Sequence, residues 1–469
     1  MRRAGRQGAG RTARALPAQL WSGKVARVVF DYTAGPDQAW DGRLLHWDIL
    51  GSLGHVEGLR ASRLLTAAQH QRLRAGLRSA LRAARGGTLR FGRQDEDVHT
   101  TVEAWLTRRL GAVGEMVHTG RSRNDQIACD LRLYLKDRVL SLHGAAESLI
   151  ETLLALGRRE GRTLWPGYSH QRRGMPSTVG LWAAGQAAGL LDSLDRVGGF
   201  WPLLDRSPLG SAAGYGVPLP LKREAAARAL GFAGLDVPVT AVQNGRGKLE
   251  ADVLFWAVQL AHDVSRLSSD LILYSSEEFG FFRLPEELTT GSSIMPQKRN
   301  PDVFELTRAR CALLEGDLAA CLALRARLTG GYHRDFQLLK EPLFRGLDRL
   351  GEVLGAMAYA VPRLGVDRAR CRDALANEVF ATDEVMRRVE SGVPFRAAYR
   401  SVAAEVRAGA SVPEPTAAVL ISRRRSTGGA GNPGFALLAR RLRAGRGWRK
   451  RTAGRFEQTL RRLAGGAVR

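Results

Sequence analysis

The sequence predicts an all-α protein: a central bundle of long helices flanked by two smaller helical domains. Three observations predict this class. Apolar residues recur at helical spacing over five long stretches, a polar loop precedes each stretch, and no stretch shows the period-two alternation of strands. We divide the chain into a basic leader (1–19), an N-terminal helical domain (20–117), the central bundle (118–365) and a C-terminal helical domain with an arginine-rich tail (366–469).

Length and composition narrow the class of protein further. A chain of 469 residues with 44% hydrophobic residues is long enough for two or three domains with a large core. The net charge of +25 is carried mostly by arginines on amphipathic helices, with only 7% aromatic residues and no nucleic-acid-binding motif. We therefore favour a compositional bias toward arginine and do not favour a nucleic-acid partner, although that alternative stays open.

The cysteines and the apolar runs indicate the compartment. Cys129, Cys311, Cys321 and Cys371 are scattered without metal-ligand spacing and follow no secretory signal, which favours free thiols in a reducing, cytoplasmic setting. No apolar run reaches the ~20 residues of a membrane span. We expect no metal site, no cofactor and no membrane association.

The N-terminal part contains a leader and two recognisable helices. Residues 1–19 carry five arginines and no acidic residue, which fits a targeting peptide, a disordered leader or an upstream mis-called start equally well. The ordered part opens at 20–24, and 47–56 is the first folded helix. Asp95–Asp97 caps a helix with His99 and Glu103 at i,i+4, where His99 is either half of an ion pair or a ligand.

A polar loop, His118–Gln126, leads into a long amphipathic helix over 126–158. Arg121 and Arg123 in this loop offer bidentate pairing, and a donor-rich loop at a helix N-terminus suits a carboxylate ligand. A solvated helix cap is the alternative.

A third polar loop, 166–176, precedes a helix over about 177–200 and contains His170. Histidine is the residue type suited to proton transfer near neutral pH, although a lone loop histidine is usually a surface one. A turn of small residues follows at 208–216, then an irregular region over 217–247. A long apolar helix spans about 248–278.

The next loop, Gly291–Asp302, combines donors, a cation and a strong helix start. Gly291 leaves the backbone unrestricted, so the groups of Ser292 and its neighbours can converge on one anion, and Lys298 adds a positive charge. Asn300 is the expected N-cap and Pro301 the first helical residue, with Asp302 and Glu305 in the first turn.

The remaining helices follow in order. Residues 301–328 and 341–361 form the fourth and fifth long helices, with a polar segment at 332–341 between them. A smaller helical module begins at 366, and an amphipathic helix over about 446–464 ends the chain.

The run G-S-S-x-M-P-x-K-x-N-P resembles the signature of the fumarase/aspartase superfamily, whose members eliminate fumarate from succinyl compounds. His118–Gln126 resembles the block HTGRSRNDQ that is typical of argininosuccinate lyases, and the order of matches holds along roughly residues 20 to 410. The resemblance implies a fumarase/aspartase-like fold and the cleavage of argininosuccinate to arginine and fumarate, the last step of arginine biosynthesis. It also implies a homotetramer in which three subunits assemble each active site.

The resemblance also implies a role for each matching residue. Ser292 matches the base, Lys298 holds the aci-carboxylate, and His170, polarised by Glu305, matches the acid for the leaving nitrogen, with Ser169 standing where most relatives have threonine. The positions implied to bind substrate are His99, Ser122, Arg123, Asn124, Asn300, Tyr332, Gln337 and Lys340.

Three departures from the family pattern leave affinity and specificity open. His170 is followed by Gln171-Arg172 where many relatives have Leu-Gln. Asp41 falls on a family aspartate, but Asp37 falls where many relatives have a substrate-binding serine, and 243–248 replaces an Asp-Arg-Asp-Phe type of segment.

Three other functions compete with this interpretation. Another lyase of the superfamily, such as one acting on adenylosuccinate, would have no reason to keep the His118–Gln126 block. A non-catalytic relative, like the lens crystallins that use this fold, need not retain the base, the acid and Lys298 together. A basic RNA-associated protein would show salt-dependent binding to nucleic acid.

Overall fold

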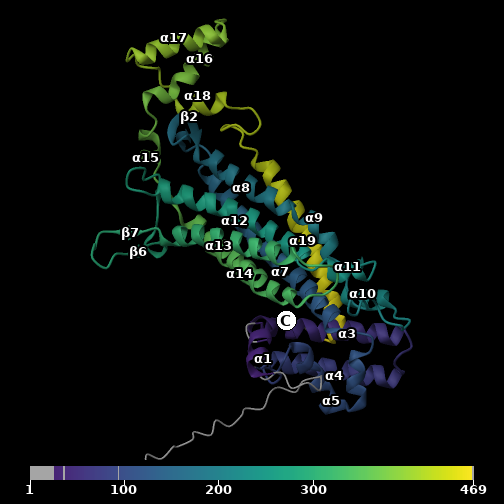
Figure 1. Ribbon diagram of the computed structural model, residues 1–469. Coiled ribbons are helices and arrows are strands. Elements are labelled where there is room, and N and C mark those ends of the chain that lie inside the picture. The colour runs from purple at the N-terminus through teal and green to yellow at the C-terminus, as the bar shows by residue number, and fades with distance from the viewer. Residues whose placement is uncertain (1–25, 35–36, 93–94, 467–469) are drawn as a thin grey trace, which may run out of the picture.

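The computed structural model describes residues 26–34, 37–92 and 95–466, and it confirms the predicted all-α class (Figure 1). The leader 1–19 and the predicted start at 20–24 lie outside the described residues. Long helices run side by side through the middle of the molecule, and shorter helices lie at its two ends.

The central bundle contains the five long helices that the periodicity predicts. Each lies within a few residues of its expected range, and the predicted helix over 177–200 is divided near Arg196. Packing joins α12 to α13, α7 to α8, α13 to α14 and α14 to α7. The elements are α7 (Arg123–Arg159), α8 (Val179–Asp195), α9 (Val197–Leu204), α12 (Lys248–Tyr274), α13 (Asp302–Arg325) and α14 (Lys340–Ala360).

Helix α7 is the one helix of the described chain that is long and apolar enough to cross a membrane. Its most apolar window is 61% buried inside the protein. Leu135, Leu142 and Leu149 form part of the hydrophobic core, and α3, α8, α14 and α19 (Phe435–Ala464) pack around the helix. These contacts make α7 the core helix of the bundle.

The N-terminal region surrounds α3, which is longer than the predicted 47–56 and packs against α4, α7 and α10. Asp97 caps α5 by accepting from the Thr100 N–H at 2.8 Å, which confirms the predicted helix start. The elements are α1 (Arg27–Ala34), α2 (Gln38–Asp41), η1 (Gly42–Leu44), α3 (Leu45–Ala61), α4 (Ala67–Arg85), α5 (Val98–Leu110), α6 (Ala112–Glu115) and η2 (Met116–His118).

The expectation of an irregular region over 217–247 was wrong. It contains α10 (Arg223–Leu230) and α11 (Thr240–Asn244), which are too short to show a helical period in the sequence. Close packing on α3 stabilises α10: a Cβ added to Gly54 would lie only 2.3 Å from Cγ of Leu230. Tertiary contact rather than local pattern therefore specifies this helix.

Strands occur only as short pairs in the described chain. The 6- and 7-residue strands of one antiparallel hairpin are the longest, and the pairs are β1–β2, β3–β4, β5–β8 and β6–β7. Their bounds are β1 (Leu164–Ser169), β2 (Arg172–Thr178), β3 (Arg206–Ser207), β4 (Gly234–Leu235), β5 (Phe282–Arg283), β6 (Thr290–Gly291), β7 (Arg299–Asn300) and β8 (Gly365–Val366).

The predicted N-cap at Asn300 was wrong by one residue. Asn300 pairs with Thr290 in the β6–β7 ladder, which holds its backbone extended, and Pro301 takes the N-cap position without a side-chain cap. Asp302 and Glu305 lie in the first turn of α13, as predicted.

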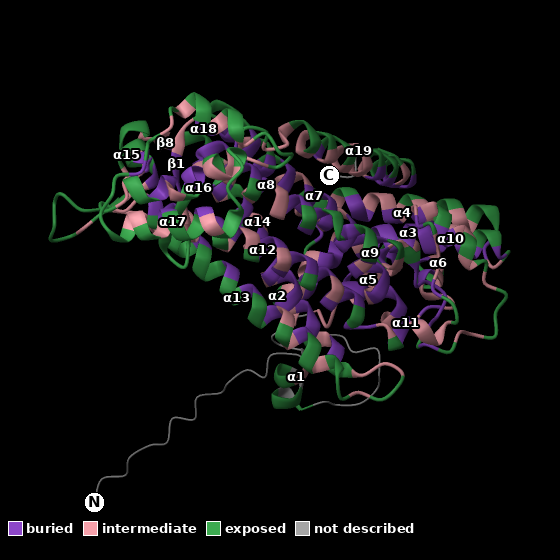
Figure 2. Cartoon of the chain, turned by 90° about the horizontal axis from the view of Figure 1, so that it is seen from above, coloured by how far each residue is buried: buried purple, intermediate pink, exposed green. Residues whose placement is uncertain are grey.

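The C-terminal region contains short helices with two small apolar clusters, one around Phe380 and one around Val402. Its last helix, α19, begins eleven residues earlier than predicted, since it starts at 435 rather than 446, and packs against α7 and α8 (Figures 1 and 2). The division into domains stays a prediction. Its other elements are α15 (Arg368–Asp373), η6 (Asn377–Phe380), α16 (Ala381–Glu390), α17 (Phe395–Arg407) and α18 (Ala417–Arg423), and three short helices precede it in the chain: η3 (Glu286–Leu288), η4 (Arg334–Leu339) and η5 (Val361–Arg363).

Candidate functional site

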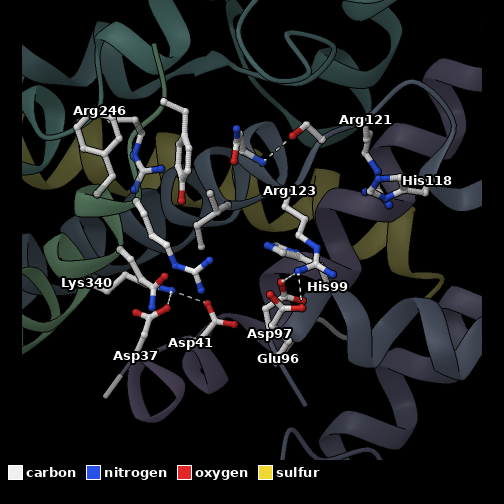
Figure 3. A pocket seen from close by; sticks show the side chains of 17 residues that line it. Asp37, Asp41, Glu96, Asp97, His99, His118, Arg121, Arg123, Arg246 and Lys340 are labelled. Carbon is white, nitrogen blue, oxygen red and sulfur yellow. Dashed lines mark hydrogen bonds and ion pairs between the residues drawn. The ribbon is translucent and has the colours of Figure 1, made fainter. Parts of the chain in front are cut away.

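A cavity of about 480 Å³ lies where the N-terminal helices meet the start of α7 and the segment before α14 (Figure 3). Seven of the eight residues predicted to bind substrate line it, and Asn300 is the exception. Its lining comprises Asp37, Asp41, Glu96, Asp97, His99, His118, Arg121, Ser122, Arg123, Asn124, Ile127, Arg246, Tyr332, Arg334, Phe336, Gln337 and Lys340.

Lys340 is held between two carboxylates on one side of the cavity (Figure 3). Its Nζ lies 2.5 Å from Asp37 Oδ2 and 2.7 Å from Asp41 Oδ1. Burial opposes the charge of Lys340, but Asp41 and Asp37 outweigh it and raise its pKa. Burial raises the pKa of Asp37 to about 6 against the opposing effect of Lys340. Lys340 is thus a cation that a substrate group can share only by competing with Asp37 and Asp41.

The two loop arginines occupy different surroundings. Arg123 Nη1 lies 2.7 Å from Asp97 and 3.1 Å from Glu96, on the opposite side of the cavity from Lys340 (Figure 3). Arg121 is buried and donates to Ser52 Oγ at 2.8 Å. Arg121 therefore braces the loop against α3, while Arg123 borders the cavity.

His99 pairs with Asp48, so the i,i+4 pair expected with Glu103 was wrong. Its Nδ1 lies 2.8 Å from Asp48 Oδ1 and 3.8 Å from Asp130 Oδ2, while Glu103 lies 3.9 Å from His118. Burial opposes the charge of His99, but the carboxylate of Asp48 outweighs it and raises the pKa to about 10. His99 therefore presents a protonated imidazole to the cavity at neutral pH.

The side chains of Asp48, His99 and Asp130 bring three ligand-type atoms within 4.8 Å of one another. A sequence search for metal-ligand spacing misses such a group because its members lie on α3, α5 and α7. The Nδ1 atom of His99 already lies 2.8 Å from Asp48 Oδ1, so this nitrogen is engaged by the carboxylate. Burial and the Asp48 carboxylate raise the pKa of Asp130, the third member of this buried cluster.

Asp125 fixes the loop that carries Ser122 and Asn124. Its carboxylate accepts from the Ser122 N–H at 3.0 Å and from the N–H groups of Gly210 and Ala212 at 3.0 and 2.9 Å. These bonds tie the loop to the 208–216 turn. Ser122 Oγ in turn accepts from the Asn124 N–H at 3.2 Å, so backbone bonds hold both residues at the cavity edge.

Tyr332 and Gln337 reach the cavity from the segment before α14. Gln337 Nε2 donates to the Thr33 carbonyl at 2.8 Å, and Arg334 donates to the same oxygen at 3.3 Å. The C-terminal end of α1 thus covers this side of the cavity.

The structure also brings in residues that the sequence did not single out for binding. Arg246 lies over the ring of Phe336 at 5.6 Å and pairs with Glu250 at 3.1 Å. Asp41, Glu96 and Asp97 add further carboxylates to the lining. In the sequence, the departure from the family pattern at 243–248 marked the segment that contains Arg246. The other lining residues could not be found in this way, because they come from segments far apart in the sequence.

The five residues predicted to be catalytic lie elsewhere. The β6–β7 loop with Ser292 and Lys298 projects from the side of the molecule, away from α1–α3 (Figure 1). Within it, Ser292 Oγ accepts from the N–H groups of Ile294 and Met295 at 3.3 and 3.1 Å. Two backbone donors at the hydroxyl oxygen favour its negatively charged form.

Ser169 and His170 lie at the tip of the β1–β2 hairpin, near α18 at the upper end in Figure 1. Ser169 pairs with Arg172, so His170 and Gln171 form a two-residue loop, and both have positive φ, 52° and 56°. Glu305 is exposed on α13, and no ion pair or hydrogen bond joins it to His170 in the part of the chain that the structure describes. Within one chain, the predicted site residues therefore lie at separate surfaces: the cavity, the region of the β6–β7 loop and the start of α13, and the tip of the β1–β2 hairpin.

Known sequences match most of the chain. A family model described as "Lyase" matches residues 58–316. The argininosuccinate lyase of Sorangium cellulosum is 44% identical over 91% of this chain and 99% of its own length. That of Parabacteroides distasonis is 40% identical over 85% of this chain and 90% of its own length.

Solved structures match the fold. An EDDS lyase in complex with formate superposes with a TM-score of 0.79 at 24% identity and covers 95% of both chains. A fumarate lyase:delta crystallin from Brucella melitensis bound to cobalt superposes with a TM-score of 0.68 at 17% identity, over 87% of this chain and 91% of that chain. At these identities the likeness concerns the helical-bundle fold.

Proposed function

The chain belongs to the argininosuccinate lyases, and on that premise we propose that it eliminates fumarate from argininosuccinate and releases arginine. This reaction is the last step of arginine biosynthesis. The observation that carries the proposal is the cavity in which the loop Ser122–Asn124, His99 and the segment Tyr332–Lys340 converge.

The charges of the cavity suit a substrate with both carboxylates and cationic groups. Argininosuccinate carries three carboxylates, an amine and a guanidinium. Lys340, Arg123 and the protonated His99 can bind carboxylates, and Asp37 and Asp41 can bind the amine or the guanidinium. Each cation is paired within the protein, so substrate binding exchanges one set of ion pairs for another.

The elimination needs a base for the proton next to a carboxylate. We assign this role to Ser292, whose oxygen accepts two backbone N–H bonds that lower the cost of deprotonation. Lys298, six residues later in the same loop, stabilises the extra negative charge that develops on the carboxylate. Asn300 follows at the base of this loop and binds the same part of the substrate.

The leaving guanidinium nitrogen needs an acid, and the electron pair of the broken C–N bond takes up its proton. We assign this role to His170, with Glu305 of another copy orienting the imidazole and Ser169 binding the adjacent carboxylate. The proton removed by Ser292 and the proton supplied by His170 balance, so acid–base chemistry completes the reaction without an oxidant or a group carrier.

A complete site requires other copies of the chain, because the cavity, the Ser292 loop and the His170 hairpin face different parts of one molecule. Helix α13 provides a surface for association: Leu306, Leu313 and Leu322 on it are 57%, 56% and 50% exposed. Phe255 on the adjoining α12 is also exposed, at 48%. We therefore propose a homotetramer whose central helices pack together and whose active sites lie between subunits.

The cysteines support a cytoplasmic location. All four are buried and free. Burial raises the pKa of Cys311 and of Cys321 to about 12, which keeps both as unreactive thiols. Such thiols suit a reducing compartment.

Release of fumarate from argininosuccinate, followed by absorbance, tests the function directly. Argininosuccinate and adenylosuccinate should be compared on the full-length protein, with Ser292→Ala as the blank. Fumarate from argininosuccinate alone is the expected result. Release from adenylosuccinate would assign the chain to another reaction of the superfamily, and silence on both from a folded tetramer would point to a non-catalytic relative.

A further inference from the structure

A second cavity, of about 700 Å³, lies between α7, α9, α10 and α19 and shares no lining residue with the first. Nothing in the elimination reaction uses it. Helix α19 forms one wall, and the segments around Asp205 and Gly231 form the opposite wall. Its size is within the ~300–1,000 Å³ range of pockets for small ligands.

The floor of this cavity is a buried cation. The Lys136 side chain is 2% exposed, and its Nζ donates to Asp205 Oδ1 at 2.6 Å and to the Gly231 carbonyl at 2.9 Å. The same Nζ lies 4.7 and 4.6 Å from the ring centroids of Phe232 and Phe456. An ammonium group is thus enclosed by aromatic faces and one carboxylate.

One wall is aromatic. Trp201 of α9 and Trp448 of α19 both line the cavity, with ring centroids 5.3 Å apart and planes at 86°. Trp201 is buried and Trp448 is half-buried, so Trp448 supplies most of the ring surface that a planar group can reach, and such stacking accepts many ring systems.

The rim carries three arginines without partners. Arg206, Arg228 and Arg455 are exposed, and no ion pair or hydrogen bond of their guanidinium groups occurs within 26–34, 37–92 and 95–466. Other arginines of α19 differ, because Arg441, Arg446 and Arg449 all pair with acids of α7 or α8. Arg455 thus differs from these three, and it lies at the mouth of the cavity with Arg206 and Arg228. The one acid among the lining residues, Asp205, is already paired with Lys136.

We propose that this cavity binds a mononucleotide, with its base stacked on the Trp201–Trp448 wall and its phosphate held by Arg206, Arg228 and Arg455. The three arginines can donate more than one bidentate pair to a phosphate, which carries the oxygens to accept them. Bound there, the ligand joins α19 to the segments of α9 and α10 and stabilises the docked position of the C-terminal helix.

Calorimetric titration of the full-length protein with AMP, adenosine and inorganic phosphate tests the proposal. AMP is expected to bind saturably, one per chain, and at least tenfold more tightly than adenosine or phosphate alone. AMP should also raise the melting temperature. These three probes separate the contribution of the ring from that of the anion.

Substitutions locate the site. Arg228→Ala combined with Arg455→Ala should weaken AMP binding at least tenfold, the effect of losing one charge-assisted hydrogen bond. Arg443→Ala is the matched control, an exposed arginine of α19 outside the cavity, and should leave the affinity unchanged. Both proteins should keep the fumarate-release rate of the parent, which shows that they fold.

Several results would overturn the proposal. Equal affinity for phosphate and AMP would show that the aromatic wall does not contribute to binding. Equal affinity for adenosine and AMP would show that the arginines do not contribute. If AMP does not bind saturably, or if the double substitution leaves AMP binding intact, this cavity is not the binding site. If a short single-stranded RNA displaces AMP and binds more tightly than AMP, the ligand of this cavity is a nucleic acid and not a mononucleotide.

Discussion

His170 and Gln171 hold the left-handed backbone conformation in which glycine or asparagine is usual for a two-residue hairpin loop. For other residues this conformation costs roughly 1–2 kcal/mol each. The strain lies at the residue that we assign as the acid. An imidazole at the tip of a tight, strained loop is exposed at the surface, where the proposed shared site needs it.

Substitutions at Gln171 test this strain. Gln171→Gly should stabilise the protein by up to about 1 kcal/mol, since glycine adopts φ near 56° freely but loses more entropy on folding. Gln171→Val should destabilise it, because a β-branched side chain tolerates this conformation poorly. Thermal unfolding of the two variants measures the difference. Equal melting temperatures would mean that the loop relaxes in solution.

The Ser292 loop provides a matched pair of serines. Ser292→Ala should abolish turnover, whereas Ser293→Ala should retain it, because in the structure it is Ser292 Oγ that receives the Ile294 and Met295 N–H bonds.

His170→Asn should also abolish turnover. Lys298→Ala should lower kcat by about 10²–10³, the loss expected for one preorganised charge at a developing oxyanion. Steady-state fumarate release measures the rates, and size-exclusion chromatography checks that each variant keeps the assembly size of the parent. Near-parent rates for Ser292→Ala or His170→Asn would reassign the base or the acid.

Asp37 should make stability depend on pH. Its pKa of about 6 lies above the ordinary value of 3.8, so between these values the folded protein keeps a proton that the unfolded chain releases. Stability from this group is present below about pH 4 and is lost as pH rises through about 6. The unfolding free energy of the parent relative to Asp37→Asn should therefore fall between pH 4 and 6, as measured by urea unfolding. A constant difference would mean that Lys340 keeps Asp37 ionised throughout.

At the scale of elements, α19 is held on the bundle by ion pairs to α7 and α8. Glu147 of α7 is buried, receives Arg449 Nε at 2.8 Å and contacts Arg446 at 3.3 Å, while His143 lies 2.9 Å away. Burial would raise the pKa of Glu147, but the bonds from His143 and Arg449 outweigh it and lower the pKa to about 2. Arg441 pairs with Asp192 and Asp195 further along.

Loss of Glu147 should therefore weaken the attachment of α19. Glu147→Gln leaves two guanidinium groups without their shared buried carboxylate and should cost about 3–5 kcal/mol. Glu151→Gln is the control, since Glu151 is 61% exposed and pairs with Arg446 at the surface, and should cost under about 1 kcal/mol.

The pH dependence gives a second test of the same pair. The pKa of Glu147 is depressed, so its stabilisation is present above the ordinary value of 4.5 and is lost as pH falls through about 2. The difference in unfolding free energy between parent and Glu147→Gln should shrink over that window. A small cost for Glu147→Gln at pH 7 would show that α19 is held mainly by its apolar face.

At the scale of the whole molecule, the separation of the cavity from the Ser292 loop is the basis for the proposed assembly. Helix α13 buries residues such as Phe304, Cys311 and Leu314 inside its own chain. It also exposes Leu306 and Leu313 on its other side. An apolar helix face of this kind at the centre of a bundle is stabilised by covering it with a second copy.

Mixed assemblies test the shared site. Ser292→Ala and Asn124→Ala should each be nearly inactive alone. Subunits of the two, dissociated and reassociated together, should recover activity in sites that take the loop from one chain and the cavity from another, on the order of a quarter of all sites for a random one-to-one mixture. Mixing without dissociation is the control and should recover nothing. If the reassociated mixture stays inactive, each chain supplies its own site.

Association itself can be tested at α13. Leu313→Arg places a charge in the proposed interface and should yield smaller species that lack activity, as measured by light scattering and fumarate release. Leu437→Arg is a control, because Leu437 is also exposed, at 45%, but lies on α19, away from α13 and from the cavity. A fully active, monomeric Leu313→Arg protein would contradict the shared site.

The sequence by itself determined the fold class, the five long helices, and the motifs that carry the chemistry. Helical periodicity records which side chains face a core, and capping residues such as Asp97 mark helix starts, so both can be predicted locally. Which of these pieces meet was decided by the tertiary structure. Lys340 lies 303 residues from Asp37, and His99 lies 51 residues from Asp48; their pairing depends on how α2, α3, α5 and α14 pack. The same packing moved the N-cap from Asn300 to Pro301, brought Arg246 into the cavity, and placed Ser292 and His170 on separate surfaces, because long-range contacts and strand pairing follow from the arrangement of whole elements and not from the residues beside them in the chain.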